Sequence, residues 1–171
     1  GATPIETWTK GGNGFESMIK PMVPYAIRGF LWYQGESNQH EDLAYAQKFT
    51  ALIEQWRAQW RSELPFYWLQ LPGFGRAMET EDAARTRDYG FAPCRMAQLR
   101  CMSIPRTGMA VALDLGDADD IHPRDKRSVG ERLARWAIAV AYGKQDVAWR
   151  GPRTKSARRD ADGIVIDFDA E

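Results

Sequence analysis

Two polar clusters in this sequence have the residue types and spacing for hydrolytic chemistry. The first, at 34–38, reads Gln-Gly-Glu-Ser-Asn, and the second, at 114–122, carries four aspartates and His122. Asp119 and Asp120 precede His122 by three and two residues, so one carboxylate can accept a hydrogen bond from one ring nitrogen while the other nitrogen acts as a general base. The same spacing also fits a loop histidine that caps the following helix. The choice between the two aspartates stays open.

The side chains of the first cluster differ in how readily a structural role explains them. Ser37 does not fit a nucleophile elbow, because Gly-x-Ser-x-Gly needs a second glycine where this chain has glutamine; we interpret it as a turn serine near a helix start. Asn38 could be a helix N-cap, since Glu41 three residues later would complete a capping box. Gln34 and Glu36 have no such explanation, because polar residues at the mouth of a buried strand cost free energy unless they meet a partner or a ligand.

The sequence gives little support for metal or disulfide chemistry. Cys94 and Cys101 lie seven residues apart in a stretch that reads as helical, which is about 10 Å along a helix axis and beyond the roughly 7 Å Cα limit of a disulfide. His40 and His122 lack the neighbouring cysteine or second histidine of a zinc site, and we expect His40 in an exposed first helical turn. We expect no metal site and no cofactor. The aspartates at 114–120 nevertheless leave a metal-dependent hydrolase as a hypothesis, beside the two functions given at the end of this section.

The elements that must position these clusters follow from the apolar pattern. Continuous apolar runs, typical of strands buried on both faces, occur at 27–33, 66–71 and 109–115. Helical periodicity separates and follows them at about 39–63, 93–102 and 124–142, and 73–90 reads as a long surface excursion. Alternating strands and helices predict an α/β fold with a parallel sheet. Ligands of such sheets bind beyond the carboxyl ends of the strands, where both polar clusters begin.

Composition excludes several classes of protein. The chain has 171 residues, a formal net charge of zero and 44% hydrophobic residues, which fits one folded domain with a real core. No apolar run approaches the roughly 20 residues of a membrane span, and the first residues lack the features of a signal peptide. The basic residues at 150–159 are followed at once by acidic ones, which we interpret as a solvated boundary and not as a nucleic-acid site.

Both ends of the sequence suggest a segment of something larger. Three parallel strands make a small sheet, since sheets commonly have four to six, and the chain begins in a turn-like Gly-Ala-Thr-Pro. Residues 164–168 alternate like a strand, with no partner expected beyond Glu171. We therefore expect an internal segment of a longer protein.

Several blocks of the sequence resemble a known family. Gly-Phe-Leu-Trp-Tyr-Gln-Gly-Glu-Ser-Asn at 29–38 resembles the third conserved block of sialate O-acetylesterase-like carbohydrate esterases, within the SGNH hydrolase superfamily. Residues 114–123 resemble the last block, followed by the family's long helix, and residues 1–9 resemble the second block. The resemblance implies a flavodoxin-like three-layer α/β/α sandwich, incomplete at its N-terminal side. It divides the chain into a partial esterase domain at 1–146 and the start of a C-terminal β region or linker at 147–171.

The resemblance also implies site residues. Deacetylation would proceed through a serine acyl-enzyme, with His122 as general base and Asp119, or alternatively Asp120, as its acid. The serine belongs to a Gly-Gln-Ser-Asn block that is absent from these 171 residues, and we expect it upstream. Oxyanion donors would be the Gly1 backbone N–H and Gln34, and the remaining residues near the substrate would be Gly35, Glu36 and Asn38.

Two functions of different classes follow. The first is a carbohydrate O-acetylesterase acting on O-acetylated sialic acid or other O-acetylated sugars, such as a decorated plant polysaccharide; this chain alone would be inactive. The alternative is a non-catalytic carbohydrate-binding or interaction remnant of the same fold. The resemblance points to the periplasm, the cell exterior or a lysosome-like compartment, and the residues present do not indicate an oligomeric state.

Overall fold

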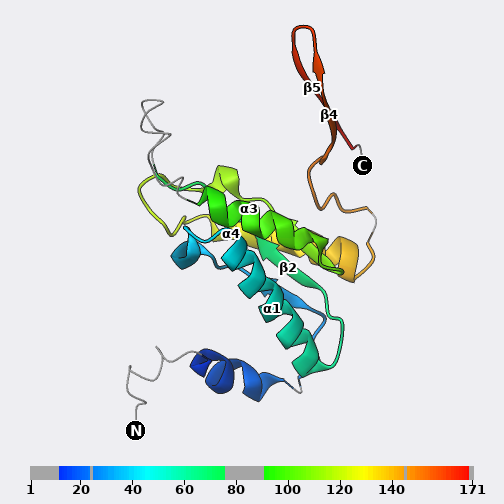
Figure 1. The fold of residues 1–171 in the computed structure, drawn as a ribbon. Helices are drawn as coiled ribbons and strands as arrows, with labels where there is room; N and C mark the ends of the chain where they lie inside the picture. Colours follow the sequence, from blue (N-terminus) through cyan, green and yellow to red (C-terminus); the bar gives the residue numbers. More distant parts are fainter. Residues whose placement is uncertain (1–11, 24, 76–90, 145, 170–171) are drawn as a thin grey trace.

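A parallel sheet of three strands organises the part of the chain that the computed structural model describes, residues 12–23, 25–75, 91–144 and 146–169. The strands are β1 (Phe30–Trp32), β2 (Phe66–Leu69) and β3 (Thr107–Ala110), and they lie in the order β1-β2-β3. β1 is in register with β2 at Phe30↔Phe66, and β2 is in register with β3 at Phe66↔Thr107. Helices flank the sheet (Figure 1), so the predicted α/β fold with a parallel sheet is confirmed.

The three predicted helices are present, each somewhat shorter than its sequence pattern. They are α1 (Leu43–Trp60), α3 (Ala92–Arg100) and α4 (Lys126–Trp136). α3 continues into a 3-10 turn at Cys101–Ser103 and α4 into a π-helical turn at Ala137–Ala141. α1 ends in a left-handed residue, Arg61, close to the end predicted near residue 63. A π-helical turn at Phe15–Ile19 and a 3-10 turn at Lys20–Met22 were not predicted.

α1 and α3 cover one face of the sheet. Phe30, Phe66 and Trp68 point to this side and form one buried cluster with Phe49 and Ile53 of α1. The rings of Phe49 and Trp68 meet edge to face with their centroids 5.1 Å apart. Cys94, Ala97 and Cys101 add the side of α3 to the cluster. Both cysteines are buried free thiols, as their spacing predicts.

α4 covers the opposite face. Val129, Leu133 and Trp136 of this helix are buried with Tyr67 and Leu69 of β2. One face of α4 therefore packs on the sheet, and with α1 and α3 on the other side the arrangement has three layers.

β3 starts and ends earlier than the predicted run at 109–115, which is a correction. The strand begins with Thr107 and Gly108, and Leu113–Leu115 form a 3-10 turn beyond it. Gly108 belongs in the strand because the Trp136 ring packs against it: a Cβ at this position would lie 2.2 Å from Cε3 of Trp136. Val111 and Leu113 are exposed. Hydrophobicity alone therefore shifted the predicted strand toward the carboxyl end.

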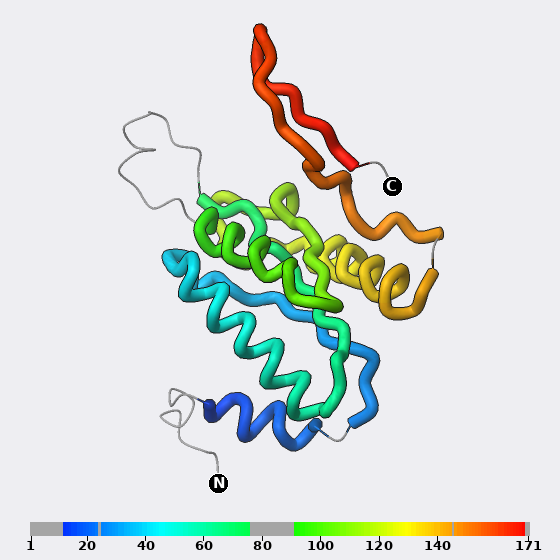
Figure 2. Tube along the Cα trace, turned by 45° about the vertical axis from the view of Figure 1, so that its right-hand side comes forward, coloured from blue at the N-terminus to red at the C-terminus, as the bar shows by residue number. Residues whose placement is uncertain are grey.

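The C-terminal segment forms a β-hairpin, which corrects a second expectation. β4 (Thr154–Asp160) pairs antiparallel with β5 (Gly163–Phe168). The strand predicted at 164–168 thus has its partner before it in the chain, within the basic run that we had interpreted as a boundary. Arg158 Nη1 and Asp167 Oδ2 lie 2.9 Å apart across the hairpin. Figure 2 shows it extending away from the sheet and its helices; the domain boundary at 146–147 stays a prediction.

Within the described ranges, no helix is both long and apolar enough to cross a membrane.

Candidate active site

The loops that follow the three strands meet at one edge of the sheet. The loop after β2 pairs with the loop after β3 through a parallel bridge between Phe74 and Asp117, and Gly75 N donates to Ala118 O at 3.2 Å. The end of β1 meets the start of α4, because Lys126 Nζ lies 4.8 Å from the centroid of the Tyr33 ring. The two polar clusters therefore lie at the carboxyl edge of the same sheet, where parallel α/β folds bind ligands.

His122 lies in the loop between β3 and α4 with its side chain 83% exposed. Its Nδ1 is 3.8 Å from Oδ1 of Asp120, and its backbone N donates to that same oxygen at 2.8 Å. The distance from the ring nitrogen to this oxygen exceeds hydrogen-bond length. Asp119 N donates to Asp117 Oδ1 at 2.9 Å, which makes a tight turn just before the histidine. Asp120 is thus the aspartate that the backbone of His122 holds against the ring.

The first cluster forms a 3-10 turn at Glu36–Asn38, directly after β1. Ser37 is exposed in this turn, in agreement with its interpretation as a turn serine. The N-cap interpretation of Asn38 is wrong, because α1 begins at Leu43 with Asp42 as its N-cap. Asn38 Oδ1 instead accepts a hydrogen bond from Gln34 Nε2 at 2.8 Å. The sequence pattern misled because Asn38 ends the 3-10 turn and four residues, 39–42, separate it from the first residue of the helix.

Gly35 occupies a backbone conformation that favours glycine. Its φ is 151°, and a Cβ would lie 3.0 Å from Cys94 Sγ and 3.1 Å from Leu71 Cδ1. The turn that carries Gln34 and Glu36 therefore packs tightly against α3 and the segment after β2. A side chain here would push the turn away from the core.

Side chains of two helices, buried in the core, donate hydrogen bonds to the backbone of this turn. Tyr45 of α1 donates its hydroxyl hydrogen to Gln34 O at 3.1 Å, and Cys94 Sγ of α3 donates to Gly35 O at 3.6 Å. Burial raises the pKa of the Cys94 thiol to about 12, with a further contribution from the negative charge of Glu36. Cys94 therefore stays protonated and is a donor here, not a nucleophile.

Glu36 also acts on Tyr33, the residue that precedes the turn. Burial, and then the charge of Glu36, raise the pKa of the Tyr33 hydroxyl. That hydroxyl oxygen is buried and has no hydrogen-bond partner among the residues described. With Lys126 over the Tyr33 ring, this corner places one carboxylate and one ammonium group next to the candidate site.

The loop of His122 is fixed to α4 by an ion pair. Arg132 Nη1 and Nη2 each donate to one oxygen of Asp114 at 2.6 Å, and Nη1 also donates to Val111 O at 2.7 Å. The Arg132 guanidinium lowers the pKa of Asp114 to about 2. The side chains that the structure describes include no group of three or more His, Cys, Asp or Glu able to hold a metal ion.

Sequence reasoning missed the residues that support the site, namely Tyr45 and Gln98 in the core and Arg132 nearer the surface. A signal for Gln98 was present: it lies in the apolar stripe Cys94, Ala97, Gln98 and Cys101, where a buried amide requires partners. Of the predicted site residues, Gly1 lies outside the described residues.

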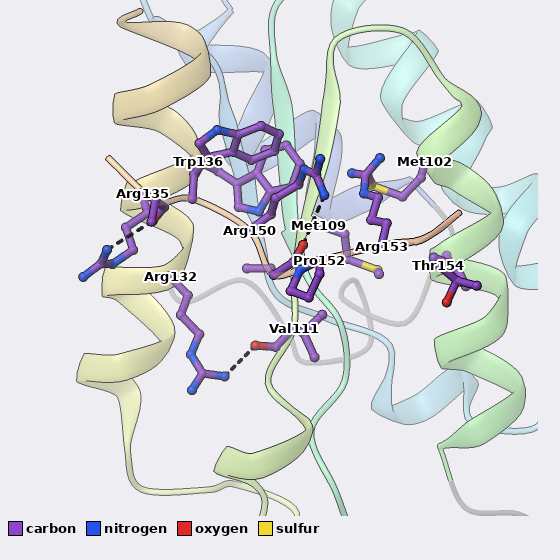
Figure 3. A pocket seen from close by; sticks show the side chains of 15 residues that line it. Met102, Met109, Val111, Arg132, Arg135, Trp136, Arg150, Pro152, Arg153 and Thr154 are labelled. Atoms are coloured by element: carbon purple, nitrogen blue, oxygen red, sulfur yellow. Dashed lines mark hydrogen bonds between the residues drawn. The ribbon is translucent and has the colours of Figure 1, made fainter. Parts of the chain in front are cut away.

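A cavity of about 750 Å³ lies away from these clusters, along the open side of β3 (Figure 3). Four arginines line it with Trp136 and Trp149. Arg132 is paired with Asp114, Arg135 donates to Ala148 O, and Arg150 is paired with Asp169. Arg135 thus joins the segment after α4 to that helix, and Arg150 joins the same segment to the end of the hairpin. None of the predicted site residues lines this cavity.

Comparison with known proteins identifies the family. Residues 1–139 match the family of carbohydrate esterases described as sialic acid-specific acetylesterases. The chain belongs to this family. It is 33% identical to the sialate O-acetylesterase of Homo sapiens, over 89% of this chain and 36% of that protein, and 37% identical to that of Rattus norvegicus, over 82% of this chain and 28% of that protein.

A solved structure supports the same family membership. The crystal structure of a carbohydrate acetylesterase from Xanthomonas citri superposes with a TM-score of 0.78 and 35% sequence identity, over 96% of this chain and 38% of that one. This carbohydrate esterase chain thus spans about a third of the length of the relatives it matches. The resemblance seen in the sequence is confirmed for both family and fold.

Proposed function

We propose that this chain provides the general base and an oxyanion donor of a carbohydrate O-acetylesterase, which removes acetyl esters from sialic acid or other O-acetylated sugars. The observation that carries the proposal is that the Gln34 turn and the His122 loop follow β1 and β3 at the carboxyl edge of one parallel sheet, in a chain of this family. Acyl transfer needs both parts at one place, a base to activate the nucleophile and a donor to stabilise the oxyanion.

The proposed roles follow the chemistry of ester hydrolysis. His122 takes the proton of a serine hydroxyl as its oxygen attacks the acetyl carbonyl, and then returns that proton to the departing sugar oxygen. A water molecule, activated by the same histidine, releases acetate from the acyl-enzyme. The Gln34 amide and the Gly1 backbone N–H donate to the oxyanion of each tetrahedral intermediate. Gly35, Glu36 and Asn38 shape the site around them.

The partner of His122 is proposed among its two neighbouring aspartates. The distance of 3.8 Å to Nδ1 supports Asp120 as the carboxylate that orients the ring, whereas Asp119 has the Asp-x-x-His spacing of the superfamily. Replacing the orienting aspartate with asparagine should lower kcat far more than the same change at the other position.

The nucleophile is proposed to be a serine outside these 171 residues, because they contain no Gly-Gln-Ser-Asn block. The test is acetate release from an aryl acetate and from O-acetylated sialic acid. It compares this chain alone with the chain joined to the N-terminal segment of the Xanthomonas citri relative. That relative is 35% identical in sequence to this chain. Circular dichroism establishes that each protein is folded.

The expected result is a folded but inactive chain alone and an active joined protein, with activity abolished by His122→Ala. Activity of the chain alone that disappears with Ser37→Ala would contradict the proposed nucleophile. A folded, inactive joined protein that still binds the acetylated sugar would favour a non-catalytic binding function.

A further inference from the structure

The amide of Gln98 is the most deeply buried polar side chain next to the candidate site among the residues described. The residue is fully buried in α3, on the stripe that faces the sheet. A buried amide costs free energy unless its donors and acceptor find partners. Its partners therefore indicate what this position contributes.

Those partners lie on two neighbouring chain segments. Gln98 Oε1 accepts from Leu71 N at 2.9 Å, while Nε2 donates to Leu69 O and to Gln34 O, each at 3.3 Å. One side chain thus joins the segment after β1 to the end of β2. It uses both amide hydrogens and the amide oxygen to do so.

Gln98 makes this connection beyond the last paired residues of β1 and β2. The register of β1 with β2 runs from Phe30↔Phe66 to Trp32↔Trp68. Gln34 is two residues beyond the last pair, so the backbone ladder between the two strands no longer holds it. Beyond this point the buried side chain of Gln98 holds the backbone through its hydrogen bond to Gln34 O.

The side-chain amide of Gln34 is fixed as well. Its Oε1 lies 3.4 Å from the Tyr45 hydroxyl, whose single hydrogen is shared between this oxygen and Gln34 O, and its Nε2 donates to Asn38 Oδ1 at 2.8 Å. A flipped amide would put its oxygen against the Asn38 oxygen, so the shorter contact, with Asn38, sets the orientation. The nitrogen carries a second hydrogen, which is the donor that the proposed function assigns to the oxyanion.

We infer that Gln98 is a positioning residue for Gln34: its buried amide sets the place of the Gln34 backbone, and thereby the place from which the Gln34 side chain donates. The inference rests on the proposed function for its catalytic consequence. Oxyanion donors act because they are in place before charge develops, and a misplacement of about 1 Å can lower a rate about 100-fold. Tyr45 assists from α1 by donating to the same carbonyl.

The test uses nuclear magnetic resonance of the isotope-labelled chain, which reports on Gln34 whether or not the protein hydrolyses esters. The variant is Gln98→Met, which keeps the volume of the side chain and removes its hydrogen bonds. We expect the side-chain NH₂ signals of Gln34 and the backbone amide signal of Gly35 to shift or broaden. The Leu71 amide should exchange with solvent about 10-fold faster, since its acceptor is gone.

Arg57→Met is the matched control. Arg57 is also a buried polar clamp, but it donates to Leu64 O at 3.0 Å and to Pro105 O at 2.8 Å, at the opposite edge of the sheet. It should leave the Gln34 signals in place at comparable loss of stability. Unchanged Gln34 signals in Gln98→Met, or an equal shift in Arg57→Met, would overturn the positioning role.

Gln98→Asn provides a second arm if Gln98→Met does not fold. It keeps a buried amide but shortens the side chain by one methylene, which withdraws the amide from Gln34 O, so the Gln34 signals should shift as well. Unaltered Gln34 signals in this variant would contradict the positioning role. In the active joined protein, Gln98→Met should lower kcat by about 10- to 100-fold with KM nearly unchanged; wild-type kcat would refute the catalytic consequence without touching the proposed esterase function.

Discussion

Arg132 and Asp114 form a two-pronged ion pair that joins the middle of α4 to the beginning of the loop carrying His122. The pair is exposed at the surface, but both of its hydrogen bonds are short and parallel, which is the geometry in which arginine binds carboxylates best. Because Arg132 also donates to Val111 O, it holds two points of the backbone as the chain leaves β3. The position of the proposed base therefore depends on this arginine.

Replacing Arg132 should release the carboxyl group of Asp114. Its pKa of about 2 lies below the ordinary 3.8, so the pair stabilises the fold above pH 4, and this contribution disappears as the pH falls toward 2. In Arg132→Gln the Asp114 pKa should rise toward 3.8, as measured by carbon-13 titration of its carboxyl group. Arg127→Gln, on the same helix but paired with Glu131, is the control and should leave Asp114 unchanged.

Gly35→Ala should destabilise the protein by about 1–3 kcal/mol. The alanine would have to adopt a backbone conformation that favours glycine, and its methyl group would lie against the Cys94 sulfur and the Leu71 side chain. Denaturant unfolding measures the change. Gly130→Ala is the matched control: this glycine lies inside α4 with nothing within 4 Å of the new Cβ, and alanine should stabilise the helix by about 0.5–1 kcal/mol. Equal stability of both variants would refute the tight packing of the Gly35 turn.

Cys94 should react very slowly with iodoacetamide in the folded protein. Its thiol is buried and its pKa is about 12, so almost no thiolate exists at pH 8. Since the unfolded thiol ionises near pH 9, this group favours the folded state below pH 9 and loses that contribution as the pH rises toward 12. Mass spectrometry after timed alkylation checks the rate against the chain unfolded in urea. Rapid native labelling would contradict the buried donor role.

Arg57→Met should lower the free energy of unfolding by about 1–3 kcal/mol. The guanidinium donates to three backbone carbonyls at the start of β2 and β3, and methionine would leave these oxygens without their donor. Thermal and denaturant unfolding measure the loss. Arg127→Met, at an exposed position of α4, should change stability by less than about 0.5 kcal/mol. A similar effect in both would show that the buried carbonyls gain little from Arg57.

The sequence predicts much of this molecule because local patterns and burial agree along most of it. β2 reads as an unbroken apolar run since it lies centrally and is buried on both faces, and the α4 stripe is the surface that packs on it. The pattern fails where a residue distant in the sequence determines the local structure. Gly108 enters β3 because of Trp136, and the basic segment of β4 becomes a strand because β5 follows it.

The candidate site likewise combines features that the sequence predicts with contacts that it does not predict. Chain topology alone brings Gln34 and His122 to one edge, because both follow parallel strands. The supports of Gln34 come from Tyr45 and Gln98, which are 11 and 64 residues away in the chain. No local spacing encodes such contacts. Asn38 illustrates the opposite error, since its local pattern matches a capping box that the 3-10 turn pre-empts.

The order of the strands has a consequence for how the chain assembles. Each strand lies beside its neighbour in the sequence, with β1 and β2 offset by 36 residues (30 to 66) and β2 and β3 by 41 (66 to 107). In the part of the sheet that the structure describes, both pairings therefore close loops of moderate length, so these strands find their partners nearby in the sequence. We expect β1, α1 and β2 to dock while the chain leaves the ribosome, with β3 and α4 adding in turn. The Gln34 turn would then be fastened by α3 before the loop of His122 is made.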